Sequence, residues 1–142
     1  MARTGTAEWR GDLQQGEGKL ALGSGAFEGP YSFKSRFEDG AGTNPEELIA
    51  AAEAGCFTMA LSLGLTEQGT PPEVLNTEAK VTLRNVDGVP TITRIDLTLR
   101  GRVDGVDEAT FKEMAGQAKE QCIVSRALGG VDEITLDAAL ES

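Results

Sequence analysis

Two cysteines, Cys56 and Cys122, are the residues of this sequence best suited to covalent chemistry. A free thiol with a pKa near 8.5 is only about 3% thiolate at pH 7, so a reactive cysteine needs a neighbour that stabilises its thiolate. The sequence contains no histidine, which excludes Cys-His and Ser-His dyads. Any catalytic thiol in this chain must therefore be activated by a different group.

Arg36 is the natural candidate for that group, because an arginine is always charged. It lies in Ser35-Arg36-Phe37, ahead of a pair of carboxylates at Glu46 and Glu47. Each of these residues also has an ordinary interpretation. A buried cysteine often serves only as a small hydrophobic residue, an arginine is usually solvated, and carboxylates at a helix start favour the positive end of its dipole. Taken singly, none of them establishes a catalytic site.

The first 42 residues predict short strands joined by tight turns. Frequent glycines separate segments that are apolar or that alternate between apolar and polar residues. These segments lie around Thr6–Trp9, Lys19–Leu22 and Tyr31–Phe37. We therefore expect a β-rich N-terminal part.

A long helix is predicted to follow, with Cys56 in its middle. Asn44 can cap this helix, Pro45 suits its first position, and Asn44 and Glu47 have the spacing of a capping box. From Leu48 to Leu65 apolar residues occur on almost every side of the helix. That pattern predicts a central helix covered all round.

The remainder of the chain predicts a half-buried hairpin, a second helix and a last strand. Apolar residues alternate in the strand segments, and they recur every three or four residues in the helix between them. The expected elements are strands Thr77–Arg84 and Thr91–Val103, a helix that Asp107 caps and Cys122 ends, a short turn at Ser125–Leu128 and a strand at Glu133–Leu140. This order of strands and helices predicts an α+β fold.

Length and composition predict one globular domain, residues 1–142. Of the 142 residues, 39% are hydrophobic and 25% are charged, which is ordinary for a chain that buries a single core. The net charge of −10 argues against nucleic acid and anionic membrane surfaces as partners. We also see no signal peptide and no stretch of about 18 apolar residues that would span a membrane, so we expect a cytoplasmic protein.

Several short motifs acquire meaning in combination. They are Glu8-Trp9-Arg10-Gly11, Ser35-Arg36-Phe37, Thr43-Asn44-Pro45-Glu46-Glu47-Leu48, Ala51-Ala52-Glu53-Ala54-Gly55-Cys56-Phe57 and Cys122-Ile123-Val124-Ser125. Together they resemble the OsmC/Ohr family of organic hydroperoxide reductases, and more closely its osmotically inducible branch. The resemblance covers essentially the whole chain. It implies an OsmC-like α+β fold and a thiol-dependent peroxidase that acts in oxidative or osmotic stress defence.

The resemblance also implies roles for four residues. Cys56 is the attacking thiol, Cys122 is the resolving thiol, and Arg36 with Glu46 orients and stabilises the thiolate. Cys56 would reduce an organic hydroperoxide to an alcohol and become a sulfenic acid, which Cys122 would convert into a disulfide. An external dithiol would regenerate the thiols, and the resemblance suggests a lipoyl protein in this role. No cofactor and no metal are expected.

Two positions depart from the usual pattern of the family. Glu53 stands where related sequences often have a histidine, and Ile123 stands where they usually have a proline. A carboxylate at Glu53 would disfavour a thiolate at Cys56 if it faced inward. We expect it to face solvent, and therefore expect local tuning of the site rather than a different reaction.

Helix geometry predicts a homodimer. Glu46 and Cys56 are ten residues apart, which is about 15 Å along the axis of a straight helix. Either the helix bends or the active site is shared between subunits. A helix that is apolar on every face also has more apolar surface to bury than the rest of one small chain can cover. We therefore expect an intertwined homodimer with its active sites at a two-fold interface.

Two other functions stay open on the residues alone. A non-enzymatic protein that binds a small apolar ligand could have the same fold, with both cysteines as packing residues. Such a protein would retain both thiols when treated with an organic hydroperoxide. A metal site is disfavoured, because two distant cysteines without histidine match none of the usual zinc spacings.

Overall fold

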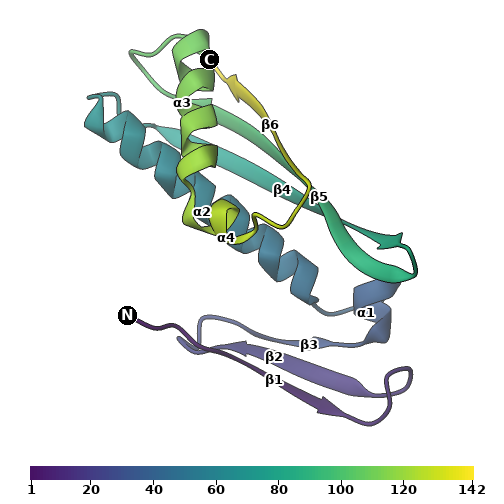
Figure 1. Cartoon of the computed structure of the whole chain (residues 1–142). Helices are drawn as coiled ribbons and strands as arrows, with labels where there is room; N and C mark the ends of the chain where they lie inside the picture. The colour runs from purple at the N-terminus through teal and green to yellow at the C-terminus, as the bar shows by residue number, and fades with distance from the viewer. The chain divides into compact units, whose positions relative to one another are not determined.

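A computed structural model describes residues Met1–Ser142. The chain forms two compact units, Met1–Leu48 and Ile49–Ser142, which are described here in turn. Helix α2 (Pro45–Glu67) begins in the first unit and continues in the second. Figure 1 labels the elements of both units.

The first unit contains a three-stranded antiparallel sheet in the order β1-β2-β3. Its strands are β1 (Gly5–Arg10), β2 (Glu17–Leu22) and β3 (Glu28–Tyr31). In the middle of the sheet, Gly18 pairs with Trp9 on one side and with Tyr31 on the other. A side chain at Gly18 would collide with both rings. The glycine thus lets Trp9 and Tyr31 pack edge to face, with ring centroids 5.3 Å apart.

The predicted third strand, Tyr31–Phe37, is wrong in its second half, which forms the short helix α1 (Phe33–Phe37). A reciprocal capping box causes the change. The Ser32 hydroxyl accepts from the Ser35 amide at 3.1 Å, and the Ser35 hydroxyl accepts from the Ser32 amide at 2.8 Å. Two helix-end donors are thereby satisfied, which outweighs the alternation of aromatic residues in this segment.

The predicted start of α2 is confirmed, although its capping box is only half formed. Asn44 Oδ1 accepts from the Glu47 amide at 2.7 Å, as a helix cap should. The Glu47 carboxylate does not return to the cap, because it accepts a hydrogen bond from Thr43 Oγ1 at 2.8 Å. One side chain of the expected reciprocal pair therefore holds the preceding loop instead.

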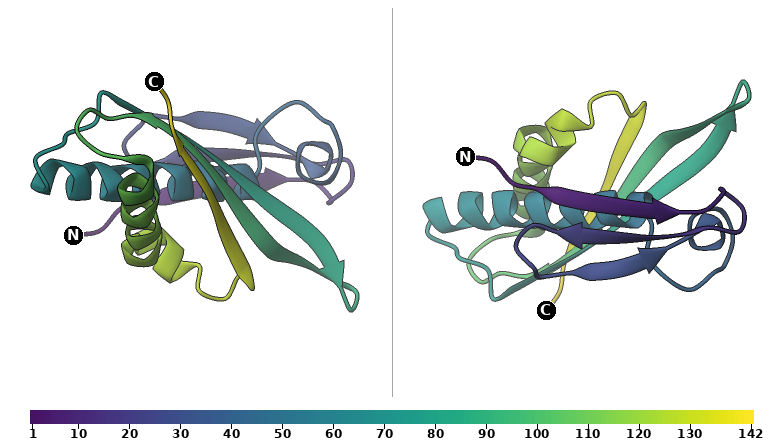
Figure 2. Two further views of the ribbon diagram at one scale, coloured as in Figure 1. Left: turned by 90° about the horizontal axis from the view of Figure 1, so that it is seen from above. Right: turned by 90° about the horizontal axis from the view of Figure 1, so that it is seen from below.

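The second unit contains the predicted hairpin and a three-stranded sheet in the order β4-β5-β6 (Figure 2). Asp87 and Gly88, both with positive φ, make the tight turn between the antiparallel strands β4 (Val74–Val86) and β5 (Val89–Arg102). The last strand, β6 (Glu133–Leu140), runs parallel to β5. Its connection carries α3 (Glu108–Gln121) and α4 (Ile123–Ala127), so the segment predicted as a short turn is a helix.

Both long helices of the second unit pack against one face of this sheet. The odd-numbered residues of β5 supply that face, while its even-numbered residues include Arg94 and Asp96, which pair with each other at 2.7 Å. The alternation predicted from the sequence is confirmed. The core joins Phe57, Leu61 and Leu65 of α2 to Leu97 and Leu99 of β5, Phe111, Ala115 and Ala118 of α3, and Cys122.

Helix α2 is covered on one stripe only. Its buried residues recur every fourth position at Glu53, Phe57, Leu61 and Leu65. Met59 and Leu63 are 76% and 60% exposed, so a single chain does not supply the all-round cover that the sequence predicts. By length and composition this helix could cross a membrane, with 22% of its most apolar window buried. The expectation that no segment meets that test is wrong, because Glu53 is the single charged residue between Glu47 and Glu67.

Candidate active site

The first unit brings Arg36 and Glu46 together, as the sequence predicts. Arg36 comes from α1 and Glu46 from the first turn of α2. Glu46 Oε1 accepts hydrogen bonds from Nη2 at 2.8 Å and from Nε at 3.1 Å of the guanidinium. Nη1 has no hydrogen-bond partner, and the Arg36 side chain is 40% exposed. The carboxylate therefore fixes one edge of the fork and leaves the other edge available to a ligand.

Hydrogen bonds to backbone carbonyls hold the loop between these two residues. The Ser35 hydroxyl donates to the Thr43 carbonyl at 2.8 Å, and the side-chain amide of Asn44 donates to the Ser35 carbonyl at 3.0 Å. The Thr43 amide also donates to the carbonyl of Pro30 at 2.8 Å. The start of α2 is thus tied directly to α1 and to β3, which fixes where Arg36 and Glu46 meet.

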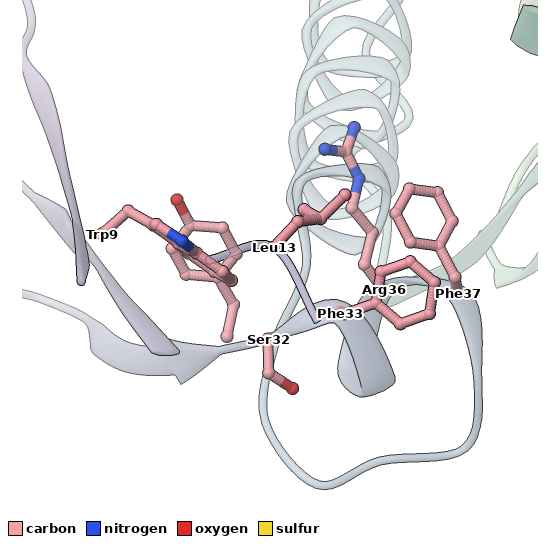
Figure 3. A pocket seen from close by; sticks show the side chains of 7 residues that line it. Trp9, Leu13, Ser32, Phe33, Arg36 and Phe37 are labelled. Carbon is pink, nitrogen blue, oxygen red and sulfur yellow. The ribbon is translucent and has the colours of Figure 1, made fainter. Parts of the chain in front are cut away.

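Beside Arg36 lies a hollow of about 270 Å³ with mainly apolar walls (Figure 3). The guanidinium carbon of Arg36 is 5.3 Å from the centroid of the Phe37 ring. The lining residues are Trp9, Leu13, Tyr31, Ser32, Phe33, Arg36 and Phe37. An apolar group in this hollow would lie next to a cationic hydrogen-bond donor. The aromatic flank of Arg36 was visible in the sequence, whereas nothing there marked Leu13.

The second unit brings Cys56 and Cys122 together, although they lie far apart in the chain. Cys56, on α2, is partly buried, Cys122 is 1% exposed, and both are free thiols. Cys122 is the joint between two helices, because it ends α3 and caps α4 by accepting from the Ser125 amide at 3.5 Å. Cys56 packs against the core cluster that contains Cys122, and its thiol raises the pKa of Cys122. The two predicted thiols therefore lie close together.

The surroundings of Cys122 favour its protonated form. Burial raises the pKa of this thiol above its ordinary value, and the neighbouring Cys56 thiol and the charge of Glu53 raise it further. Hydrogen bonds from Ser125 oppose this shift in the pKa but do not cancel it. The buried Cys122 thiol is thus harder to deprotonate than a free thiol.

Glu53 is fully buried, so the prediction that it faces solvent is wrong. It lies four residues before Phe57 and shares the buried stripe of α2, which the spacing of the apolar residues could have revealed. Its Oε1 accepts a hydrogen bond from the Ser125 hydroxyl, and its Oε2 has no partner. Ser125 therefore donates hydrogen bonds both to Cys122 and to this carboxylate.

Comparisons with known proteins identify the family of this chain. Residues 38–137 match the family described as OsmC-like protein. The chain is 46% identical over 141 residues to Peroxiredoxin OsmC of Escherichia coli, covering 99% of this chain and 97% of that protein. It is 31% identical over 103 residues to an organic hydroperoxide resistance protein of Xanthomonas axonopodis pv. citri, covering 70% and 69%.

A solved structure is similar as well. The organic hydroperoxide resistance protein OhrB of Bacillus subtilis superposes with a TM-score of 0.68 at 26% identity, covering 97% of this chain and 98% of that one. The expected OsmC-like α+β fold is confirmed. The chain belongs to the OsmC-like protein family, the family that its motifs predicted.

Proposed function

We propose that this chain is a thiol-dependent peroxidase that reduces organic hydroperoxides to alcohols. The observation that carries the proposal is the closeness of two free thiols, since Cys56 packs against the core cluster that contains Cys122, although the two are distant in sequence. The similar proteins named peroxiredoxin and organic hydroperoxide resistance protein support the same reaction class.

In the first half of the proposed reaction, the Cys56 thiolate attacks the distal oxygen of the hydroperoxide. The oxygen–oxygen bond breaks, the alkoxide takes a proton and leaves as the alcohol, and Cys56 becomes a sulfenic acid. In the second half, the sulfur of Cys122 attacks the sulfenic sulfur, a disulfide forms, and the hydroxyl leaves as water. Cys56 suits the first role because it is only partly buried, whereas Cys122 is buried and the pKa of its thiol is raised.

Arg36 and Glu46 would stabilise and orient the reacting atoms. Glu46 holds one edge of the guanidinium, so the free Nη1 can donate to the thiolate and to the peroxide oxygens. The apolar hollow beside Arg36 would take the alkyl part of the substrate. We therefore expect organic hydroperoxides to react faster than hydrogen peroxide, which has no alkyl group to bury.

The active form that we propose is a homodimer in which the whole chain acts as one functional domain. Helix α2 is continuous between Glu46 and Cys56, whose separation is about 15 Å along the axis. This favours the alternative in which Arg36 and Glu46 of one chain serve Cys56 of its partner. The exposed stripe of α2 with Met59 and Leu63 would supply an apolar contact surface. Burial of that stripe also suits a cytoplasmic protein.

The dithiol that reduces the Cys56–Cys122 disulfide would be a lipoyl protein or a related carrier. The test is turnover with dihydrolipoamide compared with thioredoxin at equal concentration. The alternative of a non-enzymatic binding protein finds no support among the similar proteins.

A single-turnover experiment tests the reaction. The reduced protein is mixed with one equivalent of cumene hydroperoxide, and thiols and disulfides are counted by peptide mass spectrometry. We expect loss of two thiols and a Cys56–Cys122 disulfide. Cys56→Ser should consume no peroxide, whereas Cys122→Ser should consume one equivalent and stop at the sulfenic acid. Retention of both thiols in the unaltered protein would point to a binding protein instead.

A further inference from the structure

Glu53, Ser125 and Cys122 form a continuous polar line inside the second unit. The Ser125 hydroxyl donates to Glu53 Oε1, and the Ser125 amide donates to Cys122 Sγ at 3.5 Å. The Ser125 side chain also lowers the pKa of the Cys122 thiol, which is consistent with a hydroxyl near the sulfur. Cys56, which packs against the core cluster that contains Cys122, lies at the end of this line. A buried carboxyl group is thus connected through one hydroxyl to the resolving thiol.

This carboxyl group has no evident structural purpose. Glu53 is 0% exposed and makes no ion pair, and its Oε2 is the only buried side-chain oxygen or nitrogen without a hydrogen-bond partner. Burying an unpaired carboxylate opposes folding, and a hydrophobic residue would suit a stripe shared with Phe57 and Leu61 better. Such a group is retained where chemistry needs it.

The second half of the proposed reaction creates that need. Cys122 must lose a proton to become a nucleophile, and the hydroxyl of the sulfenic acid must gain one to leave as water. The new sulfur–sulfur bond replaces the sulfur–oxygen bond, Cys122 is oxidised, and the sulfenic sulfur is reduced. One proton therefore moves from Cys122, which is 1% exposed, to the departing oxygen.

We propose that Glu53, acting through Ser125, accepts the proton of Cys122 as the disulfide forms and returns it to the departing hydroxyl. Oε1 receives the proton through the Ser125 hydroxyl, and the unpartnered Oε2 is free to take or release it. Glu53 and Cys56 are three positions apart on α2, so their side chains project to neighbouring positions on the helix. The inference rests on the proposed function, because it concerns the sulfenic acid of Cys56.

The groups that could compete with Glu53 as proton acceptors are few. On α2 the neighbouring titratable group is Cys56, and at the joint of α3 and α4 it is Cys122. On the outer side, Ser125 borders a surface hollow whose charged residues are Lys119, Glu120, Arg126 and Asp132. Lys119 is engaged there, since its Nζ donates to the Ile134 carbonyl at 2.9 Å.

Rapid-quench kinetics with Glu53→Gln test the proposal. The reduced dimer is mixed with stoichiometric cumene hydroperoxide, sulfenic acid is captured with a dimedone-type probe, and the disulfide is measured by mass spectrometry. We expect sulfenic acid to form at the wild-type rate and the disulfide to form about 10²-fold more slowly. Glu67→Gln, the same change at an exposed position of α2, should match the wild type in both steps.

The direction of the change separates proton transfer from a static charge. The Glu53 charge raises the pKa of Cys122, so removing a mere charge would make more thiolate and speed the second step. A disulfide step that is unchanged or faster in Glu53→Gln would overturn the proposal. A loss of structure would slow the step equally at all pH values, whereas loss of the acceptor should make its rate rise steeply with hydroxide concentration.

Ser125 variants keep the test decisive if Glu53→Gln does not fold. Ser125→Ala removes the bridging hydroxyl and should slow the disulfide step in the same way, while Ser125→Thr keeps a hydroxyl and should restore it. Rapid disulfide formation in Ser125→Ala would overturn the proposal. A wild-type protein that forms neither sulfenic acid nor disulfide would instead refute the proposed function, so the two failures are distinguishable.

Discussion

Arg36 divides its guanidinium between two tasks. Glu46 occupies Nε and Nη2, and Nη1 stays without a partner. A lysine at this position would keep the positive charge but would lose the planar fork that allows this division. The residue therefore matters for the direction of its donors as well as for its charge.

Arg36→Lys should accordingly impair the first step of the reaction. Hydrogen bonds to charged groups contribute about 1.5–3 kcal/mol, so we expect kcat/KM for cumene hydroperoxide to fall about 10- to 100-fold in steady-state assays. Arg10→Lys is the matched control, because Arg10 pairs with Glu8 on an exposed strand. Near-normal activity of Arg36→Lys would refute the positioning role.

Cys122 gives the folded protein a pH dependence of known sign. Burial, first among the causes, raises the pKa of its thiol above the ordinary value. The folded state keeps this proton where the unfolded chain releases it. The stabilisation is fully present below the ordinary thiol pKa and is lost as the pH rises toward the folded value.

Urea unfolding under reducing conditions can measure this loss. Between about pH 7 and pH 10, the free energy of unfolding should fall more for the wild type than for Cys122→Ser, because the serine does not titrate in this range. An equal fall in the two proteins would show that the pKa of the thiol is the same in the folded and unfolded states.

At the level of elements, the junction of α1 and α2 depends on Asn44. Its Oδ1 caps α2 through the Glu47 amide, and its Nδ2 ties Ser35 of α1 to the helix start. Asn44→Ala removes both contacts and should lower the free energy of unfolding by about 1–2 kcal/mol. Asn44→Asp keeps the cap acceptor, so its cost in urea titrations should be smaller. Equal costs would mean that the link to Ser35, rather than the cap, matters.

The sequence predicts elements well where the signals are local. Asn44 and Pro45 predict the start of α2, and Asp87-Gly88 predicts the hairpin turn, because caps and turns depend on a few adjacent residues. Helix α1 was missed for the converse reason. Its alternating aromatic residues resemble a strand, and the decisive Ser32 cap extends over a single short turn.

The site was less predictable, because it depends on packing between distant segments. The resemblance implied the partnership of Cys56 and Cys122, but only the packing of the helices around the common core brings the two thiols close together. The inward orientation of Glu53 runs against the general preference of carboxylates for solvent. The fourth-position spacing of Glu53 from Phe57 would have predicted burial, but the charge of Glu53 favoured the opposite prediction.

At the level of the whole molecule, the proposed dimer should depend on the exposed stripe of α2. Leu63→Lys places a charge on that stripe without altering the buried stripe that includes Leu61 and Leu65. We expect light scattering to report a monomer and peroxidase activity to fall at least tenfold, because each site would lose its partner's arginine. Val89→Lys, at the exposed hairpin end, is the control. A fully active Leu63→Lys monomer would refute shared active sites.

The packing of Trp9 against Tyr31 has a practical consequence. Trp9 is the sole tryptophan of the chain, and it lines the hollow that also contains Arg36. Intrinsic fluorescence therefore comes from the unit that would receive the alkyl group of a substrate, while both thiols belong to the other unit. The protein thus carries a built-in optical reporter of ligand entry, which can be followed separately from the oxidation state of its thiols.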